Sequence, residues 1–323
     1  MEAATLKALI TGISGFVGTH LTQYLLEQTN WQVAGTVFGP YGSIKPWWER
    51  LELYPAELSR LEVVTFILEQ VKPDFIFHLA AQPIVSLSYR DPWGTLENNI
   101  RMQLNILQAL VELEMHHSRV LVVGSGEVYG PVKPEELPIG EAQPFRPANP
   151  YAVSKVAQDM LGLQYYLAHG VQAIRARPFN HIGAGQRPGF VVPDFAQQIA
   201  AIEAGQSPPK LRVGNLTARR DFTDVRDVVR AYHLLMTLGK PGEAYNIGSG
   251  RSYAIQEVLD TLLSLSQVEI SVESDLTRMR PSDTPDVVCD ASKLHRQTGW
   301  QPTIPLEQSL ADVLDHWRER VRQ

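Results

Sequence analysis

Three glycines near the start of the chain constrain its fold more than any other feature. Gly12, Gly15 and Gly18 form a G-x-x-G-x-x-G series directly after an apolar run at residues 6–10. The first glycine permits a tight turn, the second lets the backbone approach a ligand, and the third lets a helix pack closely on the strand. We expect a buried strand, a turn and a helix over 20–28. Its first N–H groups would suit the pyrophosphate of a dinucleotide.

A strand-to-helix turn that binds nothing is the alternative, because glycine triplets also arise by chance. The position of this one, immediately after the first strand, favours the dinucleotide. The candidate cofactor contacts in the turn are Gly12, Ser14, Gly15, Phe16, Val17 and Gly18.

Composition excludes several other classes. The 323 residues are 44% hydrophobic and 20% charged with a formal net charge of -6, which is typical of a globular enzyme and gives no basic surface for nucleic acid. The single cysteine, Cys289, excludes an internal disulfide and a cysteine metal cluster, and we expect it to be a small apolar core residue. We expect no membrane span, no metal site and a cytoplasmic location.

Apolar strands and amphipathic helices alternate along the first half of the chain. Strands are predicted at 31–38, 51–54, 75–81 and 120–123, with helices at 58–71 and 94–115 between them. This alternation predicts an α/β fold with a doubly wound parallel sheet, in which ligands bind at the carboxyl ends of the strands. Further cofactor contacts are therefore expected at Leu79, Ala80 and Ala81. His78, inside an apolar run, is predicted to be a hydrogen-bonded core residue.

The end of the second strand leaves the choice between NADP and NAD open. An acidic residue there would bind the ribose of NAD and an arginine would pair with the extra phosphate of NADP, but residues 36–38 offer neither. Lys45 or Arg50 could reach a phosphate, although surface cations are usually solvated. We favour NADP.

Four polar side chains follow in an order that suggests proton transfer. Ser125 and Glu127 come after an apolar strand, and Tyr151 and Lys155 lie four apart on one face of a helix predicted over 151–169. A nearby ammonium would lower the pKa of a tyrosine toward neutrality. Read singly, Ser125 could be a turn residue and Glu127 a solvated carboxylate.

Taken together, these motifs resemble the extended short-chain dehydrogenase/reductases that act on nucleotide sugars. The resemblance covers nearly the whole chain, and its second half, including the run RPFNH at 177–181, RDFTDVRD at 220–227 and RPSD at 280–283, is similar to the GDP-mannose branch. It implies a dinucleotide-binding domain over 1–178, rejoined by about 214–248, and a nucleotide-sugar-binding lobe over 179–323. The substrate contacts that it implies are Asn180, Val191, Arg220, Arg280 and Asp283.

The activity implied first is reduction of the C4 keto group of GDP-4-keto-6-deoxy-D-mannose by NADPH or NADH, giving a GDP-6-deoxyhexose such as GDP-D-rhamnose. Tyr151 would donate the proton, Lys155 would hold the nicotinamide ribose, and Ser125 would bind the carbonyl. The alternative is the lyase GDP-mannose 4,6-dehydratase, for which Glu127 would be the base. Against it, residues 82–85 read QPIV where dehydratases typically carry QSHV, and Ser125 replaces their usual threonine.

Two further possibilities are another nucleotide-sugar reductase or epimerase, and a non-catalytic sensor of nucleotide sugars. An intact Ser125, Tyr151 and Lys155 argues against a sensor. The resemblance also implies a homodimer or a dimer of dimers, in which apolar helices around Leu104 and Leu163 would pair, although internal packing explains the same pattern.

Overall fold

The computed structural model describes residues 5–39, 42–278 and 284–322. Within them, seven parallel strands form one sheet in the order β10-β6-β5-β4-β1-β2-β3. The chain therefore runs outward from β1 to one edge, returns to β4 beside β1, and continues to the other edge. This reversal creates a crevice above the carboxyl ends of β1 and β4. The predicted doubly wound sheet is confirmed.

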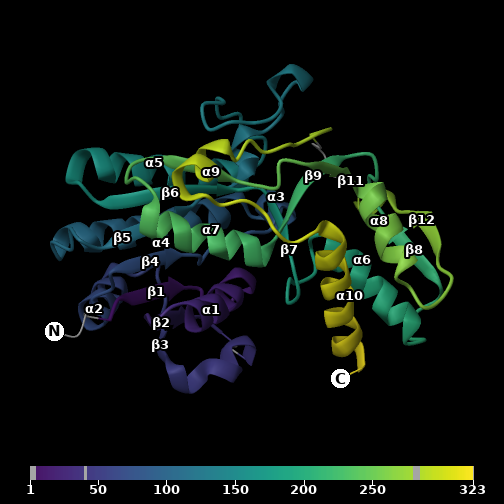
Figure 1. The fold of residues 1–323 in the computed structure, drawn as a ribbon, viewed down its shortest axis with the longest axis horizontal. Helices are drawn as coiled ribbons and strands as arrows, with labels where there is room; N and C mark the ends of the chain where they lie inside the picture. The colour runs from purple at the N-terminus through teal and green to yellow at the C-terminus, as the bar shows by residue number, and fades with distance from the viewer. Residues whose placement is uncertain (1–4, 40–41, 279–283, 323) are drawn as a thin grey trace.

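The strands of this sheet are short, and all but the edge strand β3 are well buried: β1 (Lys7–Thr11), β2 (Gln32–Val37), β3 (Leu51–Pro55), β4 (Phe75–His78), β5 (Arg119–Val123), β6 (Gln172–Pro178) and β10 (Ala244–Ile247). Helices α1 (Phe16–Gln28), α7 (Val225–Leu238) and α9 (Ser292–Thr298) pack on one face. Helices α2 (Leu61–Val71), α4 (Pro92–Glu112) and α5 (Pro150–His169) cover the other (Figure 1).

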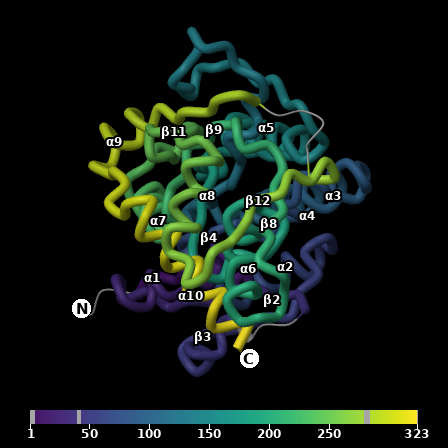
Figure 2. Tube along the Cα trace, turned by 90° about the vertical axis from the view of Figure 1, so that its right-hand side faces the viewer, coloured from purple at the N-terminus to yellow at the C-terminus, as the bar shows by residue number. Residues whose placement is uncertain are grey.

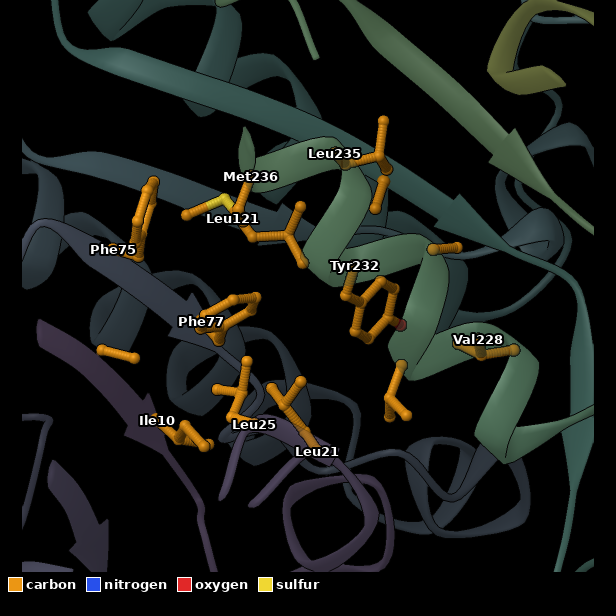
Figure 3. Packing of buried hydrophobic residues seen from close by; sticks show 14 of the residues in the cluster. Ile10, Leu21, Leu25, Phe75, Phe77, Leu121, Val228, Tyr232, Leu235 and Met236 are labelled. Carbon is orange, nitrogen blue, oxygen red and sulfur yellow. The ribbon is translucent and has the colours of Figure 1, made fainter. Parts of the chain in front are cut away.

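Alternate residues of the central strands enter opposite cores. Ile10 and Phe77 point into the core under α1 and α7, whereas Leu9 and Ile76 point into the core under α2 and α4. Figure 3 shows Met236 and Tyr232 of α7 on the side of the helix that faces Leu121 and Phe77. This burial on both faces explains why the central strands β1, β4 and β5 are mostly apolar.

A second group of elements lies at the other end of the molecule (Figure 1). Its apolar core joins α6 (Val191–Glu203), α8 (Ile255–Ser264) and α10 (Leu306–Arg322) to β8 (Lys210–Val213). β8 pairs with β12 (Ser271–Ser274), and β9 (Arg219–Asp224) lies between β7 (Asn180–Ile182) and β11 (Ser252–Ala254). Figure 2 looks onto this group from its own end of the molecule.

The division of the chain into a dinucleotide-binding domain and a substrate lobe stays a prediction. The prediction also has residues 214–248 returning to the first domain, and the position of β10 beside β6 supports this return. Short elements that the sequence did not suggest complete the fold: η1 (Gly42–Arg50), α3 (Val85–Arg90), η2 (Gly126–Tyr129), η3 (Pro134–Glu136) and η4 (Leu276–Arg278). No helix of the described residues is long and apolar enough to cross a bilayer.

Several predicted boundaries were wrong. The first helix begins at Phe16 rather than residue 20, because Gly15 is its N-cap. The fourth strand ends at His78 rather than residue 81, where the chain leaves the sheet at the crevice. Helix α2 begins at Leu61 rather than residue 58. Cys289 and His78 are core residues as predicted, with the Nδ1 of His78 hydrogen-bonded to the Thr11 hydroxyl at 2.9 Å.

The packing of α7 on the sheet can be tested within one helix. Leu235 is fully buried and Leu238, three residues later, is 49% exposed. Leu235→Ala should lower the free energy of unfolding by about 3–5 kcal/mol, because it removes buried methyl groups and leaves a cavity. Leu238→Ala should change it by less than about 0.5 kcal/mol. Urea denaturation of the two variants would show this difference, and equal effects would contradict the placement of α7.

Candidate active site

The glycine turn forms the floor of one large cavity. Gly12 has a φ of +69°, a conformation that favours glycine, and a Cβ at Gly18 would lie 2.4 Å from the carbonyl oxygen of Gly12. The turn therefore requires glycine at these two positions. The first N–H groups of α1 stay unpaired within the helix and face the cavity, as a pyrophosphate would need.

The cavity brings together every predicted site residue that the structure describes. It is lined by the cofactor candidates Gly12, Ser14, Gly15, Phe16, Val17, Gly18, Leu79, Ala80 and Ala81, by Ser125, Glu127, Tyr151 and Lys155, and by Asn180, Val191 and Arg220. Arg280 and Asp283 lie outside the described residues. These predicted site residues thus meet in one crevice, although they are up to about two hundred positions apart in the sequence.

Lys155 is held at the centre of this crevice. It is 4% exposed, and its ammonium group donates a hydrogen bond to the carbonyl oxygen of Val123 at 2.9 Å. Its Nζ lies 5.8 Å from the centre of the Tyr151 ring, as expected for residues one helical turn apart. Burial lowers the pKa of Lys155 to about 7.

Tyr151 departs from the prediction in its electrostatics. The sequence suggested that Lys155 would lower the pKa of its phenol, but in the structure this pKa is raised above its ordinary value. Burial is the main cause, a hydrogen bond from Ser125 opposes it, and the charge of Glu127 adds to it. The expectation was wrong because burial penalises the charged phenolate, and this desolvation is the largest influence on the pKa of Tyr151. Tyr151 is therefore a protonated phenol at neutral pH.

Asn149 organises the residues around Tyr151, and the sequence analysis did not identify it. Its side-chain oxygen caps α5 by accepting from the N–H of Ala152 at 2.7 Å, and its Nδ2 donates to a carboxylate oxygen of Glu127 at 3.2 Å. An asparagine directly before a proline at a helix start is a capping signal that could have revealed the first contact. The second depends on tertiary packing.

Asn99 fixes the wall between β4 and α5. It is fully buried on α4, accepts from the N–H of Gln82 at 2.8 Å and donates to the Ser154 hydroxyl at 3.0 Å. These bonds join the loop after β4 to the helix that carries Tyr151 and Lys155.

The end of β2 and the start of η1 offer hydroxyl groups rather than charges next to the turn. The Thr36 hydroxyl accepts from the N–H of Gly12 at 3.2 Å, and the Ser43 hydroxyl donates to the carbonyl oxygen of Ser14 at 2.8 Å. Arg50 does not line the cavity; it donates instead to the carbonyl oxygen of Leu26 at 3.0 Å. The idea that Arg50 reaches a phosphate was therefore wrong. Residues 36–38 carry no acidic side chain, so no carboxylate there would repel the extra phosphate of NADP.

The fold and the crevice thus define a dinucleotide-binding α/β protein with a serine, a tyrosine and a lysine at its centre. Residues 9–313 match the family model described as GDP-mannose 4,6 dehydratase, and the chain belongs to this family.

Two relatives and one solved structure place the chain more closely. It is 40% identical to GDP-6-deoxy-D-mannose reductase of Pseudomonas aeruginosa, covering 99% of each chain, and 29% identical to GDP-mannose 4,6 dehydratase 1 of Arabidopsis thaliana, covering 95% of this chain and 88% of that one. The structure titled as RMD from Pseudomonas aeruginosa complexed with NADPH superposes with a TM-score of 0.86 at 37% identity, covering 98% of this chain and all of the other.

Loss of the Tyr151 hydroxyl should strongly reduce turnover while leaving the affinity for NADPH nearly unchanged. Tyr151→Phe removes the proposed proton donor, so we expect turnover to fall at least about 100-fold, the usual contribution of a general acid. NADPH affinity, measured by fluorescence titration, should stay within about threefold of the original. Tyr165→Phe, on the same helix but outside the cavity, is the control and should keep full turnover. Equal turnover of the two variants would refute the role of Tyr151.

Proposed function

We propose that this protein reduces the C4 keto group of GDP-4-keto-6-deoxy-D-mannose with NADPH or NADH, giving a GDP-6-deoxyhexose such as GDP-D-rhamnose. The observation that carries the proposal is that Tyr151, Ser125 and Lys155 line the same cavity as the dinucleotide turn. A relative named as the corresponding reductase, matched over nearly its full length, supports it.

The residues of the turn fit a bound dinucleotide. The glycine backbone leaves room for a pyrophosphate above α1. Lys155, on α5 in the same cavity, would hold a ribose hydroxyl. The bound NADPH or NADH supplies a hydride. Ser125 would hydrogen-bond the carbonyl oxygen, and Tyr151 would donate its phenolic proton to the oxygen as it becomes an alkoxide.

We propose that the diphosphate of the nucleotide sugar binds beside Arg220. Arg220 lines the cavity, with Nη1 hydrogen-bonded to the carbonyl oxygens of Arg219 and Thr284 at 2.7 Å each. These bonds fix the guanidinium plane, which suits bidentate contact with phosphate oxygens. Asn180 and Val191 would line the same nucleotide path.

A dehydratase is the second candidate, because the carboxylate of Glu127 lies in the cavity close enough to influence Tyr151. In that enzyme Glu127 would remove the C5 proton, whereas reduction of a ketone needs no base. We propose instead that Glu127 positions groups through Asn149.

Replacement of Glu127 separates these two functions. If the protein is a reductase, Glu127→Gln should lower turnover of the 4-keto substrate by no more than about tenfold, the cost of one lost hydrogen bond. Oxidation of NADPH followed at 340 nm, roughly the absorbance band of the reduced nicotinamide, would measure it. A loss as large as that of Tyr151→Phe, or conversion of GDP-mannose by the unaltered protein without added cofactor, would establish the dehydratase.

We also propose that the protein forms a dimer through α3, α4 and α5. These helices pack together and expose six large hydrophobic side chains, namely Leu87, Tyr89, Trp93, Val153, Met160 and Leu167. Leu104 and Leu163, named from the sequence, are half-buried on two of the same helices. A surface of this kind is usually covered by a partner, and a second copy would bury the same patch on both subunits.

A charge in this patch should separate the subunits. Leu167→Glu, at a side chain that is 72% exposed, should convert the dimer to a monomer in light scattering, because pairing would bury an uncompensated carboxylate. Leu238→Glu, on the opposite face of the sheet, should remain dimeric. A monomer in the unaltered protein would remove the proposal.

For location, we propose the cytoplasm. Cys289 is buried and unpaired, which suits a reducing compartment.

A further inference from the structure

A deeply buried tyrosine on α7 has a hydroxyl group without a protein partner. Tyr232 is 1% exposed, and its hydroxyl makes no hydrogen bond to any residue that the structure describes. Two tyrosines that are buried as deeply have partners: Tyr129 donates to Asn246 at 2.6 Å, and the Tyr245 hydroxyl accepts from the N–H of Lys240 at 3.0 Å. An unpaired polar group inside a protein costs free energy, so the hydroxyl of Tyr232 needs an explanation.

The hydroxyl of Tyr232 faces the large cavity. The ring belongs to the apolar core between α7 and the sheet, yet the residue also lines the cavity. Figure 3 shows the hydroxyl oxygen on the side of the ring that is turned away from Phe77. Because the core encloses the rest of the ring, the hydroxyl end is the part of the side chain that a ligand in the cavity would meet.

The end of strand β5 connects Tyr232 to the catalytic residues. The side chain of Val123 packs against the core that contains Tyr232, while its carbonyl oxygen accepts from the ammonium group of Lys155 at 2.9 Å. Helices α5 and α7 lie on opposite faces of the sheet. Tyr151 and Tyr232 therefore approach the same part of the cavity from opposite faces.

The hydroxyl of Tyr232 carries a hydrogen that it must donate. Burial raises the pKa of this phenol, and the charge of an ionised Tyr151 raises it further, as expected for two phenols that lie near each other. Tyr232 is therefore protonated at neutral pH. Since no described residue accepts its hydrogen, a ligand in the cavity has to supply the acceptor.

We infer that the Tyr232 hydroxyl donates a hydrogen bond to the carboxamide oxygen of the bound nicotinamide. This inference rests on the proposed function, in which Lys155 holds the nicotinamide ribose and Tyr151 protonates the carbonyl oxygen that the hydride reduces. The nicotinamide ring then has to lie beside both residues, in the part of the cavity that Tyr232 reaches from α7. The carboxamide is the polar substituent of that ring, and its oxygen is an acceptor.

A hydrogen bond from Tyr232 would fix the rotation of the ring about its bond to the ribose. Hydride transfer requires the donor carbon to be held close to the acceptor carbon in one orientation. Lys155 would hold the ribose from the side of α5, and Tyr232 would hold the carboxamide from the side of α7. Tyr232 is thus assigned to orientation of the cofactor, a function that leaves its hydroxyl unpaired in the free protein.

Isothermal titration of the whole chain with two ligands would test this contact. Tyr232→Phe removes only the hydroxyl, so the affinity for NADPH should fall about five- to tenfold, the net value of one hydrogen bond. The affinity for 2′-phospho-ADP-ribose, which lacks the nicotinamide ring, should not change. NADH and ADP-ribose would replace this pair if the protein binds NADH more tightly.

Tyr245→Phe is the matched control for this variant. Tyr245 is as deeply buried as Tyr232 but does not line the cavity, so its replacement should leave the affinities for both ligands unchanged. Equal losses of NADPH affinity in Tyr232→Phe and Tyr245→Phe would overturn the inference, because they would reflect a general effect of removing a buried hydroxyl.

Thermal unfolding provides a second measurement that does not depend on activity. Without ligand, Tyr232→Phe should unfold at the same temperature as the original protein or higher, because it removes an unpaired buried hydroxyl, whereas Tyr245→Phe should unfold at a lower temperature. NADPH should raise the unfolding temperature of Tyr232→Phe less than that of the original protein. A lower unfolding temperature for ligand-free Tyr232→Phe would show that the hydroxyl has a structural role and would contradict the inference.

The remaining outcomes separate this inference from the proposed function. An equal loss of affinity for NADPH and for 2′-phospho-ADP-ribose in Tyr232→Phe would overturn the inference, since the hydroxyl would then contact a ribose or the pyrophosphate. Unchanged affinity for NADPH would also overturn it. If the proposed function is wrong, the unaltered protein will bind the cofactor but leave the 4-keto sugar unreduced. The titrations contain no sugar, so they decide the contact of Tyr232 in that case as well.

Discussion

The carboxylate of Asp159 is the interaction on which the arrangement of the catalytic crevice depends. It is completely buried on α5, one turn beyond Lys155, and it accepts hydrogen bonds from Arg175 at 2.7 Å and from Arg177 at 2.8 and 3.0 Å. Both arginines come from β6. A buried carboxylate is tolerated only when its oxygens are satisfied in this way, so the two guanidinium groups fix the position of α5 against the sheet.

The same network reaches the other half of the crevice. Arg177 donates to the Tyr129 hydroxyl at 2.9 Å, which in turn donates to Asn246 of β10 at 2.6 Å. Tyr129 ends the short η2 segment that begins directly after Ser125. Tyr129 therefore helps to position Ser125, which directly precedes η2. Asp159 helps to position Tyr151 and Lys155, because all three lie on α5. Hydrogen bonds are stronger in the protein interior, where the dielectric constant is low, and a fully satisfied network of this kind specifies one arrangement of the side chains.

The chemistry of Tyr151 shows where reasoning from residue spacing fails. A separation of four residues correctly placed Lys155 and Tyr151 on one helical face, because the period of a helix is a local property. The pKa of the phenol was predicted in the wrong direction, because it depends on how much water the surrounding elements exclude. A protonated Tyr151 suits a group that must give a proton to an oxygen, and burial of Lys155 is part of the same environment.

The sequence alone determined the parallel sheet, the glycine turn and the identity of the polar groups at the strand ends, because these follow from local periodicity and from conformations that only glycine adopts easily. The start of α1 was predicted wrongly, because Gly15 caps the helix in the structure and the helix begins directly after it. Only the tertiary structure brought Asn149 to Glu127 and Asp194 to within 3.8 Å of Arg278, which lie 84 positions apart in the chain. No local pattern records such contacts, because they arise where separately folded segments pack against one another and exclude water.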